Sequence, residues 1–153
     1  AIFAMAVTLV RPYQWVWELA YFWGLGGSLQ AVLTPDLSVT FPHVIYIKFF
    51  LSHGCTIVGV IFLAVGLRRP ICFKSVLRVF GITNIYGLFV LGFNRIFGTN
   101  YMYLLHKPTH PSLLDYAGSG LYYYFGLEAL LAMSLLFYYF PYYLVSLKRN
   151  RKF

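Results

Sequence analysis

His53, in the apolar string KFFLSHGCTIVGV, is the residue of this sequence best suited to proton chemistry. An imidazole titrates near neutral pH, so a histidine inside an apolar segment can act as a general base or as a proton relay. The simpler alternative is a histidine hydrogen-bonded to a backbone carbonyl or a tyrosine hydroxyl, and spacing alone favours that alternative. Cys55 is excluded as its nucleophile on a regular helix, because residues two positions apart point about 200° apart around the axis. Any nucleophile must come from another helix.

Two carboxyl groups and three amides also fall inside apolar segments: Glu18, Glu128, Gln30, Asn84 and Asn94. Hydrogen bonding between helices is a sufficient explanation for the three amides. It is also sufficient for Glu18, which can pair with Arg11 or with Arg78. Glu128 falls near mid-membrane, where a carboxyl group must be protonated, paired or exposed to a water-filled cavity.

Composition identifies the surroundings of these side chains. Hydrophobic residues make up 60% of the chain and charged residues only 10%, and the mean hydropathy is +0.70, far outside the range of soluble domains. The sequence therefore predicts an all-α, polytopic transmembrane helix bundle that forms a single domain over residues 1–153. The net charge of +8 fits basic residues gathered in cytoplasmic loops, so no nucleic-acid partner is predicted.

Apolar segments of membrane length, bounded by Pro, Gly, Asn or charged residues, predict four complete spanning helices. Their ranges are about 13–33, 44–67, 76–97 and 116–147. Residues 1–10 form an apolar run of about half that length, without the charged start and cleavage site of a signal peptide. We expect this run to be the end of a preceding spanning helix whose beginning lies before Ala1.

Lys and Arg residues gather on one predicted side of the membrane. They are Arg11, Arg68, Arg69, Lys74, Arg78, Lys148, Arg149, Arg151 and Lys152. The opposite loops, residues 34–43 and 98–115, hold only Lys107 and two acids. The positive-inside rule thus predicts a multi-pass protein of the cell membrane whose C-terminus is cytoplasmic and whose loops 34–43 and 98–115 face outward.

Metal, cofactor and disulfide chemistry receive little support. His106, His110 and Asp115 lie close in the sequence, but Pro108 and Pro111 break the helical spacing that a metal site would use. The two cysteines, Cys55 and Cys72, are predicted to lie at different depths and to be free thiols. The GLGG string of residues 24–27 lacks the spacing and the strand–helix context of a dinucleotide fingerprint, so no cofactor is predicted.

Four long strings occur here in the same order as similar strings in the bacterial YwaF-like integral membrane proteins, and the chain resembles that family over nearly its whole length. The strings are ELAYFWGLGGSLQAVLTPDL, FPHVIYIKFFLSHG, GTNYMYLLHKPTHPSLLDYAG and YYYFGLEAL. Eukaryotic relatives of that family include a TMEM-type membrane acyltransferase that works on ether phospholipids. More distant relatives are membrane hydrolases of fatty-acid esters that use a Thr and a His.

The resemblance implies one catalytic residue in this chain. Members carry a Leu-Pro-Leu-His-x-Cys-like string just before the position that matches Ala1, and the Cys of the relatives is the expected acyl-accepting nucleophile. The residue that matches its histidine partner is His53, in the SHG of residues 52–54. A thiol needs such a base within hydrogen-bond reach to become the thiolate that attacks an ester carbonyl.

The supporting residues are predicted to surround an outward cavity with His53 at its floor. In this hypothesis the glycines of residues 24–27 let a neighbouring helix approach closely, and Gln30 points into the bundle. Asp36, Asn100, Tyr101 and Asp115 line or ring the mouth, and Gln30 or Asn100 donates to the developing oxyanion.

Three functions remain open at this stage. In the first, the protein is a lipid acyltransferase or acyl hydrolase that uses His53 as the base and membrane lipids as partners. In the second, it is a non-catalytic accessory subunit or assembly factor of a larger membrane complex. In the third, Glu18, Glu128 and His53 form the proton or cation relay of a small transporter.

Overall fold

The structure, a computed structural model, describes residues 1–150, with side chains described for residues 1–147. The helices are α1 (Ile2–Val10), α2 (Gln14–Leu33), α3 (Val44–Leu67), α4 (Phe73–Phe97) and α5 (Leu121–Asn150), with short 3-10 helices η1 (Tyr101–Tyr103) and η2 (Leu113–Ala117) between α4 and α5. No strand occurs in this part of the chain, so the predicted all-α class is confirmed there.

Three helices are long and apolar enough to cross a membrane: Val44–Leu67, Phe73–Phe97 and Leu121–Leu147. They identify a multi-pass membrane protein. The predicted count of four spans is not confirmed, because α2 is not among these three. At 20 residues, α2 has the length of a span. Its glycines, its two glutamines and Glu18 dilute its apolar composition.

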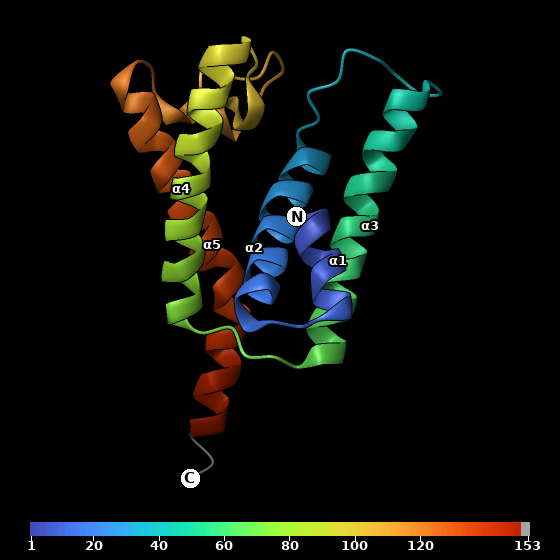
Figure 1. The fold of residues 1–153 in the computed structure, drawn as a ribbon, viewed down its shortest axis with the longest axis vertical. Coiled ribbons are helices and arrows are strands. Elements are labelled where there is room, and N and C mark those ends of the chain that lie inside the picture. The colour runs from blue at the N-terminus through green and yellow to red at the C-terminus, as the bar shows by residue number, and fades with distance from the viewer. Residues whose placement is uncertain (151–153) are drawn as a thin grey trace.

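α2 occupies the centre of the bundle. In Figure 1 it runs between α4 and α5 on one side and α1 and α3 on the other. Nine of its residues are buried, and Trp17 and Ala20 are completely so. The helix that composition makes least suited to lipid is therefore the one that other helices cover.

Two glycines allow close contacts between elements. A Cβ atom on Gly24 of α2 would lie 2.6 Å from Cγ2 of Val60 in α3, so the Val60 side chain packs directly on the α2 backbone there. A Cβ atom on Gly126 of α5 would collide with the backbone of Ala117 in η2. The first contact fixes α3 on α2, and the second seats the outer loop on α5.

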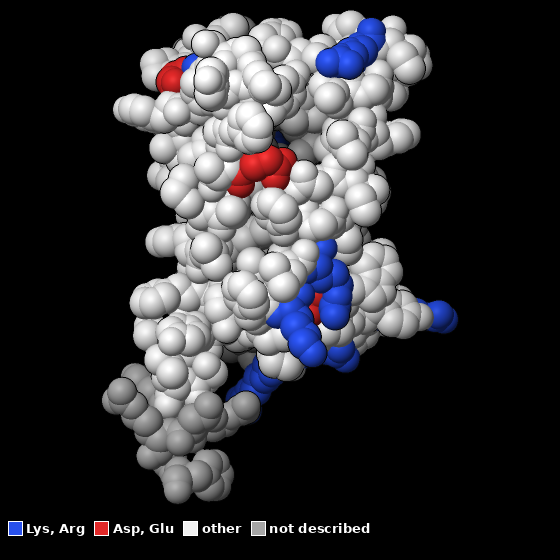
Figure 2. Space-filling view, turned by 90° about the vertical axis from the view of Figure 1, so that its left-hand side faces the viewer, with Lys and Arg blue, Asp and Glu red and all other residues white. Residues whose placement is uncertain are grey.

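The two ends of the bundle differ in charge. The turn between α1 and α2 and the connection from Arg68 to Cys72 lie together at the lower end in Figure 1, and the C-terminal end of α5 points the same way. Figure 2 shows most of the blue Lys and Arg side chains of that face gathered toward this end. The predicted basic residues 148–152 lie outside the described side chains.

Two helix starts differ from the predicted ranges. α4 begins at Phe73 instead of near residue 76, because the backbone N–H of Cys72 donates to Ser75 Oγ (3.1 Å) and closes its first turn earlier. α5 begins at Leu121 instead of near residue 116. Gly118 and Gly120, both with positive φ, separate it from η2.

Candidate functional site

His53 lies on the half of α3 that is nearer the outer loops. Its ring is half-buried and packs on Phe49, with the ring centroids 4.6 Å apart. Phe49 in turn contacts Phe50, and Phe50 contacts Tyr46. No hydrogen bond joins the His53 ring to another residue in the part of the chain that the structure describes. Its two ring nitrogens are therefore open to an external partner.

The packing of α3 on α2 determines where His53 points. Thr56, Val60 and Leu63 are the buried residues of α3, and Val60 is the one that meets Gly24. His53 lies two turns before Val60, within about 20° of it around the helix axis. Because α2 and α3 run antiparallel, His53 is level with Gln30 and Ala31, six and seven residues beyond Gly24. The imidazole thus stands on the inner side of α3, beside the outer half of α2.

The two amides predicted as oxyanion donors have other partners. Gln30 Nε2 donates to Thr34 Oγ1 (2.7 Å) within α2. Asn100 Nδ2 donates to the carbonyl oxygen of His106 (2.7 Å), and Asn100 Oδ1 accepts the N–H of Leu105 (3.0 Å). Asn100 therefore shapes the outer loop. Gln30 is half-buried and uses one of its two amide N–H groups to bond Thr34, the residue that ends α2.

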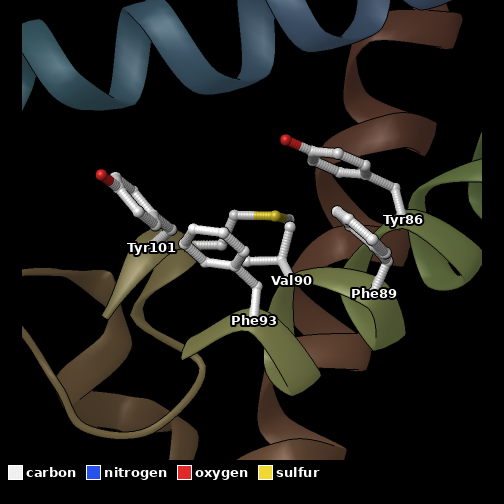
Figure 3. Close-up of a pocket in the computed structure, with 6 residues that line it drawn as sticks. Tyr86, Phe89, Val90, Phe93 and Tyr101 are labelled. Atoms are coloured by element: carbon white, nitrogen blue, oxygen red, sulfur yellow. The ribbon is translucent and has the colours of Figure 1, made fainter. Parts of the chain in front are cut away.

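A groove opens on the outer half of α4. It has a volume of about 390 Å³ and is lined by Tyr86, Phe89, Val90, Phe93, Tyr101 and Met102. Figure 3 shows the hydroxyl groups of Tyr86 and Tyr101 pointing to the same side, toward the blue ribbon of α2. Tyr86 also contacts Trp23 of α2, with ring centroids 5.6 Å apart. Tyr101, predicted as a headgroup-level aromatic, is thus a wall of this groove.

Asp36 ties the loop after α2 to the loop between α4 and α5. Its Oδ2 accepts from the hydroxyl of Tyr103 (3.1 Å), and its Oδ1 accepts from Thr109 Oγ1 (2.7 Å) and lies 2.7 Å from His110 Nδ1. These hydrogen bonds, that from His110 first, lower the pKa of Asp36 to about 2. Asp36 therefore acts as a structural carboxylate that closes the outer end of the bundle.

Sequence reasoning missed the partners of Asp36. Thr109 and His110 lie 73 and 74 residues away from it, and the prolines beside His110 pointed only to a loop. Asp115, predicted at the cavity mouth, instead caps η2 by accepting the backbone N–H of Ser112 at Oδ2 (2.8 Å). One signal was available in the sequence. A Pro-Asp pair ends the helix, and the loop on the same predicted side of the membrane contains several hydrogen-bond donors for that Asp.

The two intramembrane carboxyl groups belong to separate clusters. Glu18 is 2% exposed and accepts from Arg78 (2.7 Å) and Ser75 (2.8 Å), so Arg78 is the partner chosen from the two predicted. Glu128 is half-buried and accepts from Asn84 Nδ2 (3.1 Å) across α4 and α5. No hydrogen bond among the described residues links either cluster to His53.

The remaining candidate chemistry lies elsewhere. Cys55 and Cys72 are both exposed and unbonded to each other. The Ser75 hydroxyl lowers the pKa of the Cys72 thiol, but Cys72 stands at the start of α4, at the end of the bundle opposite to His53. Among residues 1–147, no three His, Cys, Asp or Glu side chains come together in an arrangement that would hold a metal ion.

Comparison with known proteins identifies one family. The model of the TMEM164 family matches residues 1–139. No curated protein and no solved structure matches the chain.

Proposed function

The chain belongs to the TMEM164 family, and from this premise we propose that it transfers or hydrolyses the acyl group of a membrane lipid with His53 as the general base. The observation that carries the proposal is the state of His53. It is a half-buried imidazole on the inner side of a membrane-length helix, packed on the ring of Phe49, with neither nitrogen hydrogen-bonded to a described residue. A histidine that served only to join helices would form a hydrogen bond from a ring nitrogen to a neighbouring helix.

The chemistry asked of His53 is a proton transfer in two directions. As a nucleophile attacks the ester carbonyl, the imidazole removes its proton and a tetrahedral oxyanion forms. When the oxyanion collapses, the ester C–O bond breaks and His53 returns the proton to the departing alkoxide. The base is regenerated, and the acyl group has moved to the nucleophile.

The nucleophile is the open element of the proposal. The resemblance to the YwaF-like proteins implies a cysteine whose matching position precedes Ala1. Cys55 points away from His53 on the same helix, and Cys72 lies at the other end of the bundle. Water or the hydroxyl of a lysolipid would give hydrolysis or direct transfer with the same base.

The aromatic surfaces beside α2 suit a lipid substrate. The groove on α4 begins at Tyr86, level with Trp23, and extends outward. His53 lies outward of Val60, which is level with Gly24. The groove lies on the α4 side of α2 and His53 on its α3 side, at similar depth, so the groove offers a surface for a lipid chain but does not itself hold an ester at His53.

The two other functions lack such an observation. A relay would need Glu18, Glu128 and His53 to communicate, and they belong to separate clusters. The accessory-subunit alternative makes His53 dispensable for turnover, so the same experiment decides between it and the enzyme.

The test measures acyl transfer by the purified full-length protein in nanodiscs. The substrates are a phospholipid with a deuterated acyl chain and a lysophospholipid acceptor, and mass spectrometry follows the label into new phospholipid and free fatty acid. We expect His53→Ala to lower the rate by about 100-fold or more, which is the usual contribution of a general base. His53→Gln should not restore it, because an amide cannot take the proton.

His106→Ala is the matched control. His106 is an exposed histidine of the outer loop, outside the groove, and its replacement should leave the rate unchanged. An inactive parent protein, or an active His53→Ala variant, would refute the role of His53 and favour a subunit of a membrane complex.

A further inference from the structure

The end of the bundle opposite to His53 carries positive charge that no acid among the described residues neutralises. We define the basic face as Arg11, Arg68, Arg69 and Lys74, which lie on the α1–α2 turn, the α3–α4 connection and the first turn of α4. We propose that the basic face binds the headgroups of anionic phospholipids in the adjacent leaflet. This inference is independent of the proposed acyl chemistry.

The nearby acid is already engaged. Glu18 is the acidic residue at this end of the described chain, and its two oxygens accept from Arg78, Ser75 and Gln14. Asp36 and Asp115 belong to the opposite end, and Glu128 lies within α5. Arg78 thus compensates Glu18, and the four cations of the basic face keep their charge for an external anion.

The connection that carries these cations is held in place. Gln14 Nε2 donates to the carbonyl oxygen of Pro70 (2.8 Å), which fastens the connection to the start of α2. Ile71 is only 4% exposed and belongs to the core, while Arg68 and Lys74 on either side are exposed. The backbone that carries the cations therefore needs little ordering when they bind, which favours affinity.

The depth of the basic face matches the headgroup region. Exposed apolar side chains of the two flanking spans, Val65 in α3 and Phe73 and Leu77 in α4, face outward next to it. Lys and Arg directly beyond such spans lie among lipid phosphates. Arginine binds phosphate oxygens in a bidentate way, and the positive end of the α4 dipole adds to the attraction.

The test uses the three native tryptophans as donors. Trp15 and Trp17 lie in the first turn of α2, at the same end as the basic face. The full-length protein is reconstituted in phosphatidylcholine vesicles with a trace of dansyl-phosphatidylglycerol or dansyl-phosphatidylcholine, and energy transfer to each probe is titrated. We expect a preference for phosphatidylglycerol in the parent. Arg68→Gln/Arg69→Gln/Lys74→Gln should reduce that preference by about 10- to 100-fold, since each cation near the surface contributes about fivefold.

A matched variant separates location from net charge. Lys48→Gln/Arg95→Gln/Lys107→Gln also removes three positive charges, but from residues nearer the opposite end of the bundle. This variant should keep the preference for phosphatidylglycerol. The variant Arg68→Lys/Arg69→Lys should keep it too, and that result would also show that the connection tolerates substitution. Equal losses in both Gln triples, or no preference in the parent, would overturn the proposal. Full competition by 10 mM inorganic phosphate would also overturn it, because that result indicates a site for free phosphate.

Discussion

α2 and α3 are neighbouring antiparallel helices of similar length with opposite relations to their surroundings. α2 contains Glu18, Gln30 and three glycines, yet Trp17, Ala20 and Phe22 are at most 2% exposed. α3 carries as many glycines but is the more apolar helix, yet its Leu51, Phe62 and Val65 are each more than 60% exposed. In a water-soluble protein the more apolar helix would be the buried one.

The difference follows from what surrounds each helix, lipid around α3 and protein around α2. Lipid tails are as apolar as leucine, so a peripheral helix needs only apolar side chains and buries few of them. A central helix must instead satisfy polar groups and meet its neighbours closely, which selects glycine and hydrogen-bonding residues. His53 differs from the other polar residues near it on α3, because Ser52 and Thr56 donate to backbone carbonyls of their own helix whereas the His53 ring bonds no described residue.

The strongest test of the central role of α2 is to remove the charge partner of Glu18. Arg78→Gln leaves a carboxylate that is 2% exposed with only neutral donors, Ser75 and Gln14. We expect the free energy of unfolding in detergent to fall by about 3 kcal/mol relative to the parent. This is the lower end of the range for breaking a buried ion pair, because Arg78 itself is half-exposed. Equilibrium unfolding followed by tryptophan fluorescence measures this difference.

Two variants control that measurement. Arg95→Gln changes an exposed arginine of the same helix and should alter stability by less than about 0.5 kcal/mol. Adding Glu18→Gln to Arg78→Gln should recover part of the loss, since it removes the stranded charge. If the double variant is less stable than Arg78→Gln alone, the stranded charge of Glu18 is not the cause of the loss, and the ion pair does not hold α2 against α4.

A smaller effect, with opposite signs in the two helices, is expected from glycine substitutions. Gly24→Ala in α2 places a methyl group 2.6 Å from Val60 and should destabilise by about 1 to 2 kcal/mol. Gly66→Ala in α3 meets no atom within 4 Å and should stabilise by up to about 1 kcal/mol through helix propensity. Thermal unfolding of the two variants compares them, and equal effects would contradict the contrast between centre and periphery.

The smallest effect concerns the residues just beyond α2. The pKa of Asp36 is lowered to about 2, below its unfolded value of about 3.9. Its contribution to stability is therefore complete above about pH 4 and is lost as the pH falls through 2. We expect proteolysis of loop 98–120 by pepsin, divided at each pH by the rate on an unfolded peptide substrate, to accelerate between pH 4 and pH 2, and Asp36→Asn to abolish that acceleration. A variant that still shows the same pH dependence would assign it to another group.

The sequence predicted the helical class and the membrane environment well, because both follow from composition and segment length. It also identified Arg78 as a possible partner of Glu18, since both lie near the same predicted boundary. It did not predict the centrality of α2, because it counted α2 as a span by its length and bounds and did not use the lower apolar content that sets this helix apart from α3, α4 and α5. Here the glycines and polar residues were the better guide.

The candidate site was less predictable. The position of His53 on an inner helix face needs the contact between Gly24 and Val60, which joins residues 36 positions apart. The Asp36 cluster joins two loops more than 70 residues apart, and no local pattern encodes such a pairing. Asn100 and Asp115 were identified as polar loop residues, but their hydrogen bonds shape the loop itself.

The packing of α3 has a mechanical consequence for His53. The outer ends of α2 and of the α4–α5 loop are fastened to each other through Asp36, whereas no such hydrogen bond holds the outer half of α3 among the described residues. The rest of α3 is held by two neighbours, by α2 where Val60 meets Gly24 and by α1 where Met5 lies against Gly59. A tilt of the outer half of α3 therefore moves His53 while Val60 and Leu63 keep their contacts.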